Sequence, residues 1–132
     1  MAALRWLDRT LSVSNVYLAL CLDEELFYRE LVRMGVKPNS APEWIPKSGH
    51  ACCHFLEHKG REVCIVCIRP EKRPIEDIYG LLVHEAVHIW QRAAELMGEK
   101  EPASEQEAYA VQHISLQLMW SYRGQTKRKR ST

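Results

Sequence analysis

Hydrophobic and polar residues follow distinct patterns along the chain, and each pattern predicts a kind of element. An unbroken apolar run over 16–22, bounded by Asn15 and Asp23, is typical of a buried strand, although a helix is also possible there. Asp23 then suits the N-cap of a helix, because acidic residues and regularly spaced apolar residues follow it as far as Gly35. The pattern therefore predicts a strand followed directly by a helix over 24–34.

A long loop and a hairpin are expected next. Three prolines between residues 36 and 49 oppose regular structure, so this segment is predicted to be a loop. Two short runs rich in strand-forming residues, 51–58 and 61–68, are separated by Lys59 and Gly60. A two-residue connection that contains glycine is typical of an antiparallel hairpin.

Two helices are expected in the second half of the chain. Pro74 suits the first position of a helix, and the residues after it are apolar on nearly every side until Gly98. This helix is therefore predicted to run through the core. A final helix is predicted from about Ser104 to Tyr122, and Gly124 is expected to end it and release a basic tail.

Composition is that of an ordinary globular protein. The chain has 132 residues, of which 46% are hydrophobic and 27% charged, which suits one domain and excludes fibrous or low-complexity classes. We expect one α+β domain over 1–123, with a small antiparallel or mixed sheet whose hairpin packs on the central helix. Residues 124–132 are expected to form a flexible basic tail.

Charge and cysteine content indicate a cytoplasmic protein that does not enter membranes. The net charge of +1 provides no overall field for nucleic acid, so the run Lys127 to Arg130 is the only basic feature that could bind it. The seven-residue run 16–22 is far shorter than a bilayer span of about 20 residues. Five cysteines without a recognisable secretion signal favour reduced thiols, and the predicted hairpin sets Cys52 opposite Cys67.

The central helix carries the motif HExxH at residues 84–88. His84 and His88 are one turn apart, so their rings project only about 40° from one another and can bind the same ion. Neutral imidazoles are good zinc ligands, and Glu85, rotated by about 100°, can act as general base on a water that the metal activates. The alternative is that both histidines are merely polar positions on a core helix.

A third ligand must come from another element. Gln91 and Ala94 stand where a metzincin has glycine and histidine, so that subclass is excluded. In the last predicted helix, Glu107 interrupts an otherwise apolar stripe, and a carboxylate in such a position needs a partner. Glu105 is about 200° away on a mixed face, so Glu107 is the better candidate.

These residues together resemble a known class of enzymes. HEAVH at 84–88, followed 19 residues later by Glu107 and the sequence AYA, resembles the gluzincin type of zincin metallopeptidase, and most closely the minimal phage and bacterial zincin-like domains such as the ImmA/IrrE type. The resemblance covers about 62–117. It implies a zincin-like fold, one zinc ion bound by His84, His88 and Glu107, and Glu85 as base in the hydrolysis of a peptide or protein.

Two alternatives to a peptidase stay open at this point. The resemblance does not extend to the second, mostly helical domain of larger members, so the site could belong to a non-catalytic metal-containing binding module of viral or mobile-element origin. A nucleic-acid-binding role through Lys127 to Arg130 is the other.

Cys64 and Cys67 do not form a zinc knuckle with Cys52 and Cys53, because residues three apart on a strand face opposite sides. The oligomeric state is left open.

Overall fold

The computed structural model describes residues 4, 6, 7, 16–98 and 104–130, with side chains up to residue 127 in the last helix. The elements, in order along the chain, are strand β1 (Val16–Cys21), helix α1 (Glu24–Arg33), the short 3₁₀ turn η1 (Pro38–Ser40), strands β2 (Ala51–His58) and β3 (Arg61–Ile68), and helices α2 (Ile75–Leu96) and α3 (Ser104–Arg130). The expected elements are all present, and the α+β class is confirmed.

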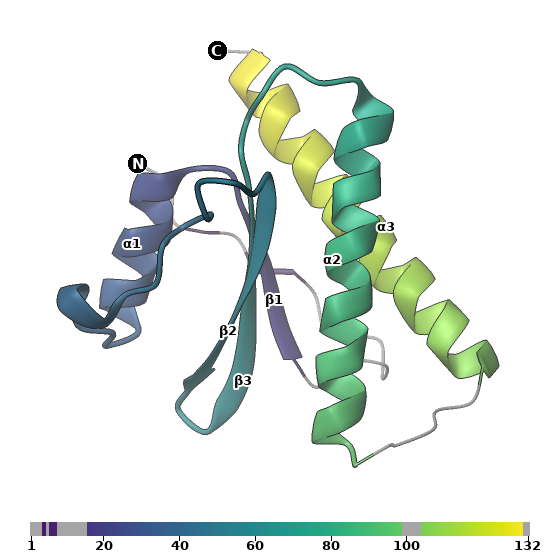
Figure 1. Cartoon of the computed structure of the whole chain (residues 1–132), viewed down its shortest axis with the longest axis horizontal. Coiled ribbons are helices and arrows are strands. Elements are labelled where there is room, and N and C mark those ends of the chain that lie inside the picture. Colours follow the sequence, from purple (N-terminus) through teal and green to yellow (C-terminus); the bar gives the residue numbers. More distant parts are fainter. Residues whose placement is uncertain (1–3, 5, 8–15, 99–103, 131–132) are drawn as a thin grey trace.

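The three strands form one mixed sheet in the order β1-β3-β2. β1 runs parallel to β3, and β2 and β3 form the predicted antiparallel hairpin, with Cys52 opposite Cys67. Figure 1 shows α1 against one face of this sheet and α2 with α3 against the other. Within the described residues no strand pairs with the outer side of β2, so β2 is an edge strand of this sheet.

The alternation of side chains explains why β1 reads as a continuous apolar run. Leu18 and Leu20 belong to the core formed with α2 and α3, whereas Ala19 and Cys21 belong to the core formed with α1. A strand that is covered on both faces has no solvent-facing positions, so its sequence shows no polar alternation. Asp23 caps α1 as predicted, because its carboxylate accepts from the backbone amides of Glu25 and Leu26.

α2 lies across the sheet with one side open to solvent, so the prediction that it runs through the core is wrong. Leu82, Ala86 and Ile89 are fully buried against the sheet and α3, whereas Val83 and Val87 are 37% and 36% exposed. The helix begins at Ile75, one residue later than expected, with Pro74 as its N-cap.

α3 continues through Gly124 to Arg130, where the sequence predicts a helix ending near Tyr122 and a flexible tail. A hydrogen bond to β1 and one within the helix lie just beyond Gly124. The Gln125 side-chain amide donates to the Leu20 carbonyl oxygen at 2.9 Å, and the Thr126 hydroxyl donates to the Tyr122 carbonyl oxygen at 2.9 Å. No helix among the described residues is long and apolar enough to span a membrane.

Candidate metal centre

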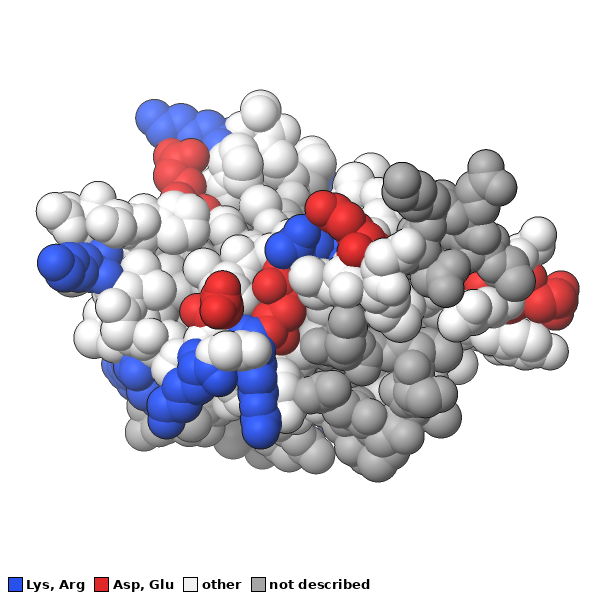
Figure 2. All heavy atoms as spheres, turned by 90° about the horizontal axis from the view of Figure 1, so that it is seen from below, with Lys and Arg blue, Asp and Glu red and all other residues white. Residues whose placement is uncertain are grey.

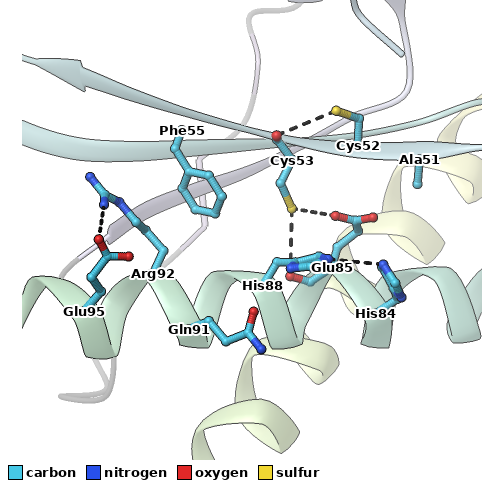
Figure 3. Close-up of a pocket in the computed structure, with 10 residues that line it drawn as sticks. All are labelled: Ala51, Cys52, Cys53, Phe55, His84, Glu85, His88, Gln91, Arg92 and Glu95. Carbon is cyan, nitrogen blue, oxygen red and sulfur yellow. Dashed lines mark hydrogen bonds and ion pairs between the residues drawn. The ribbon is translucent and has the colours of Figure 1, made fainter. Parts of the chain in front are cut away.

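A cleft of about 540 Å³ lies between β2 and α2 (Figure 3). β2 supplies one wall and α2 the other, and the lining residues are Ala51, Cys52, Cys53, Phe55, His84, Glu85, His88, Gln91, Arg92 and Glu95. The HExxH motif therefore opens into a cleft that is lined by several ionisable side chains. A site on two rigid elements keeps its side chains in fixed positions.

His84 and His88 stand side by side at the solvent-exposed edge of this cleft. Their Nε2 atoms are 3.2 Å apart and their ring centroids 4.8 Å apart. Two nitrogens bound to one tetrahedral zinc, each about 2.05 Å from the metal, are about 3.3 Å apart. The two rings therefore have the spacing that one shared ion requires, which is also the spacing of a hydrogen bond between them.

Glu85 faces the opposite wall of the cleft. Its side chain is 5% exposed, and its Oε2 accepts a hydrogen bond of 2.7 Å from the Cys53 thiol. Figure 3 shows the Cys53 side chain projecting from β2 toward the Glu85 carboxylate. Because a buried carboxylate without a hydrogen bond is costly, this contact fixes where the carboxylate lies.

Cys53 is a donor in this pair. Its hydrogen bond with Cys64, its burial and the nearby charge of Glu85 all raise the pKa of the Cys53 thiol far above its ordinary value. The thiol therefore keeps its proton at neutral pH and offers it to Glu85. A protonated thiol is a poor nucleophile, and in this structure Cys53 positions the carboxylate.

Glu107 is not beside the two histidines. Its Oε2 accepts a hydrogen bond of 3.0 Å from Nε1 of Trp90, which is buried against α3. Trp90 follows His88 by two residues, so the two side chains leave α2 about 200° apart. The structure brings His84, Glu85 and His88 to one cleft and leaves Glu107 on another side of α2. Within the described residues, no group of three His, Cys, Asp or Glu side chains is arranged to hold a metal ion.

One end of the cleft carries a cation that the sequence does not reveal as part of the site. The Arg92 guanidinium donates to Glu62 at 2.8 Å and to Glu95 at 3.3 Å, which ties α2 to β3.

The sequence also does not reveal Cys53 as part of the site. Strand alternation from the predicted Cys52 and Cys67 pair already indicates that Cys53 faces the other side, but only packing sets it against Glu85.

Comparison with protein-family models, with curated proteins and with solved structures finds no match for this chain.

Proposed function

We propose that this protein is a zinc-dependent metallopeptidase whose site is the cleft between β2 and α2. The observation that carries the proposal is the 3.2 Å spacing of the His84 and His88 Nε2 atoms, which matches two ligands of one tetrahedral zinc. Glu85 follows His84 directly and shares the cleft with both rings. The five free cysteines suit a reducing compartment, and a cytoplasmic location is part of the proposal.

The residues of the motif and Cys53 have different roles in this reaction. Zinc, when bound, supplies a Lewis acid that polarises the scissile carbonyl and lowers the pKa of water. His84 and His88 hold the ion as neutral imidazoles. Glu85 takes a proton from the attacking water and returns it to the leaving nitrogen, so that peptide hydrolysis balances in protons. Cys53 keeps the Glu85 carboxylate in place through its thiol proton.

The substrate is proposed to be an extended peptide bound along β2. This strand has an open outer edge in the described part of the chain, and its residues line the cleft beside the motif. An extended peptide can add to such an edge through backbone hydrogen bonds while its side chains alternate between the cleft and the solvent.

Purified protein should contain about one zinc per chain and should cleave peptides from an unbiased library. Glu85→Gln should lower kcat at least about a hundredfold while zinc content stays the same, because the proton carrier is lost and the imidazoles are not. Glu95→Gln, a change of another carboxylate in the same cleft, is the matched control and should keep its activity. A protein without bound divalent metal at neutral pH would contradict the proposal.

Glu107 is proposed as the third zinc ligand, and this requires its carboxylate to leave the Trp90 indole when zinc binds. Glu107→Gln should then weaken zinc binding at least about tenfold in a competition titration with a chelator. Trp90→Phe removes the competing N–H donor and should leave zinc affinity equal or higher. Glu105→Gln is the control on the same helix. Equal zinc affinity for Glu107→Gln and the unaltered protein would exclude Glu107 from the site.

A non-catalytic metal-binding module is the second candidate function. It is favoured by the Cys53 hydrogen bond, which directs the Glu85 carboxylate toward β2, and by the position of Glu107 on Trp90. This candidate predicts bound metal without cleavage of any peptide in the library. Cleavage that Glu85→Gln abolishes would exclude it.

A further inference from the structure

The outer face of α3 carries large apolar side chains that the fold leaves exposed. Tyr109 and Trp120 are 64% and 61% exposed, and Leu116 is 36% exposed. Counted from Tyr109, the other two positions lie seven and eleven residues further on, so all three project within about 40° of one another. Leu118, on the side that packs in the core, is fully buried. The three exposed residues lie on the face opposite the core, with the polar residues Gln112 and His113 between Tyr109 and Leu116, and are called here the α3 stripe.

Charged residues stand at the two ends of the α3 stripe. Glu105 lies one turn before Tyr109, and Arg123 and Lys127 lie after Trp120 within the same sector of the helix. Figure 2 shows acidic side chains at the end of the molecule where α3 begins. The ion pairs between described residues involve none of these three side chains. One end of the stripe is therefore acidic and the other basic.

We propose that the α3 stripe binds a second copy of this chain, with the two α3 helices antiparallel across a two-fold axis. The axis lies midway between Tyr109 and Trp120, so each tyrosine faces the tryptophan of the other copy. Leu116 lies within about 3 Å of the axis along the helix, and the two leucines meet there. Measured along the helix axis, Glu105 then lies within about 1.5 Å of Arg123 in the second copy.

The charge pattern is what selects a second copy. A two-fold interface must be complementary to itself, so an acidic end can only meet a basic end if the helices are antiparallel. Aromatic residues at the centre with charges at the rim are typical of protein interfaces. The α3 stripe faces away from the core, and none of its residues lines the cleft between β2 and α2. Pairing through it leaves that cleft open.

Sedimentation of the full chain over a concentration series tests the pairing. We expect a reversible dimer, and Trp120→Lys should raise its Kd about a hundredfold, because the substitution removes two central contacts by symmetry. Val32→Lys changes an equally exposed apolar residue, 58% exposed, on α1, and should leave the Kd unchanged. Circular dichroism should show native helix content for both variants.

Charge exchange tests the antiparallel arrangement. Glu105→Lys and Arg123→Glu each create two repulsive contacts in a dimer and should each raise the Kd about tenfold at low salt. An equimolar mixture of the two variants should form a heterodimer with nearly the original Kd, because every contact then joins opposite charges. Chelator present throughout should change none of these results, which separates this pairing from bridging by a metal at His84 and His88.

Any one of four results would overturn the proposal. One is a monomer at all concentrations up to roughly 0.1 mM. Another is a dimer that Trp120→Lys does not weaken. The third is a mixture of the two charge variants that associates no better than either alone. Binding of the stripe to anionic lipid vesicles in place of self-association would likewise assign it to a different occupant. None of these measurements depends on peptidase activity.

Discussion

Glu85 has only 5% of its surface exposed, and the Cys53 thiol supplies the hydrogen bond that its carboxylate needs in that position. At the scale of single residues, the candidate site is thus a pair of exposed imidazoles beside a carboxylate held by a thiol. The short hydrogen bond from the protonated thiol holds this carboxylate toward β2, and the same direction favours the non-catalytic candidate function.

The Cys53 and Glu85 pair predicts a change in thiol reactivity that does not depend on catalysis. Glu85→Gln removes a negative charge that helps to raise the pKa of Cys53, so the thiolate fraction of Cys53 should rise. Alkylation of Cys53 by iodoacetamide at pH 8 should then be faster by at least about threefold. The measurement is mass spectrometry of the peptide that contains Cys53 after timed reaction.

Glu95→Gln is the control for this experiment, since Glu95 lines the same cleft and the charge that raises the pKa of Cys53 is that of Glu85. It should leave the alkylation rate of Cys53 unchanged. Equal rates for Glu85→Gln and the unaltered protein would show that the carboxylate does not contact the thiol in solution.

At the scale of elements, the turn of the hairpin and the interior of α2 make opposite demands on glycine. Gly60 has a φ of 76°, in the left-handed region that side chains avoid, and it closes the two-residue turn between β2 and β3. Gly80 lies within α2, and a Cβ there would have no heavy atom within 4 Å. The turn requires glycine at position 60, whereas glycine at position 80 only lowers the stability of the helix.

The same substitution at these two glycines should therefore change stability in opposite directions. Gly60→Ala should lower the free energy of unfolding by about 1 kcal/mol, because alanine is strained at positive φ. Gly80→Ala should raise it by about 0.5 to 1 kcal/mol, because alanine favours the helix. Urea unfolding followed by circular dichroism measures both. Two shifts of the same sign would contradict the described turn or the described helix.

At the scale of the whole molecule, thiols are concentrated in the sheet. Cys67 in β3 lies between Cys21 in β1 and Cys52 in β2, since it is paired in register with each of them. Cys21 and Cys67 are fully buried. Burial, together with the hydrogen bond and charge of Cys21, raises the pKa of the Cys67 thiol well above its ordinary value. Folding therefore keeps a proton on Cys67 at a pH where the unfolded thiol has lost it.

Stability should fall as pH rises above about 9, where the unfolded thiol ionises. The unfolded chain then binds fewer protons than the folded chain, so the free energy of unfolding decreases by about 1.4 kcal/mol per pH unit for one retained proton. The double variant Cys21→Val with Cys67→Val should lack this contribution. Urea unfolding at about pH 9.5 and about pH 10.5 in reducing buffer measures both proteins, which share all other titrating groups. Above the unfolded thiol pKa the lowered pKa of Cys21, caused by its hydrogen bond with Cys67, no longer contributes with the opposite sign. Equal losses in the two would refute the assignment.

The sequence by itself determined the features that depend on neighbours along the chain. Asp23 predicts its helix because the cap bonds two backbone amides close by, and Lys59 with Gly60 predicts the hairpin because the turn sets the register. His84 and His88 share a side of one helix because of their spacing alone. These features are local, so the pattern of residue types is sufficient to predict them.

The tertiary structure alone decided which distant groups meet. It placed Glu107 on Trp90, Cys53 on Glu85 and the end of α3 on β1, and none of these contacts follows from helix or strand periodicity. The expected end of α3 near Tyr122 was wrong because Gly124 is tolerated in a helix whose next residue, Gln125, is hydrogen-bonded to β1. Contacts between distant segments depend on how whole faces pack together, and a pattern along one element contains no information about the element that covers it.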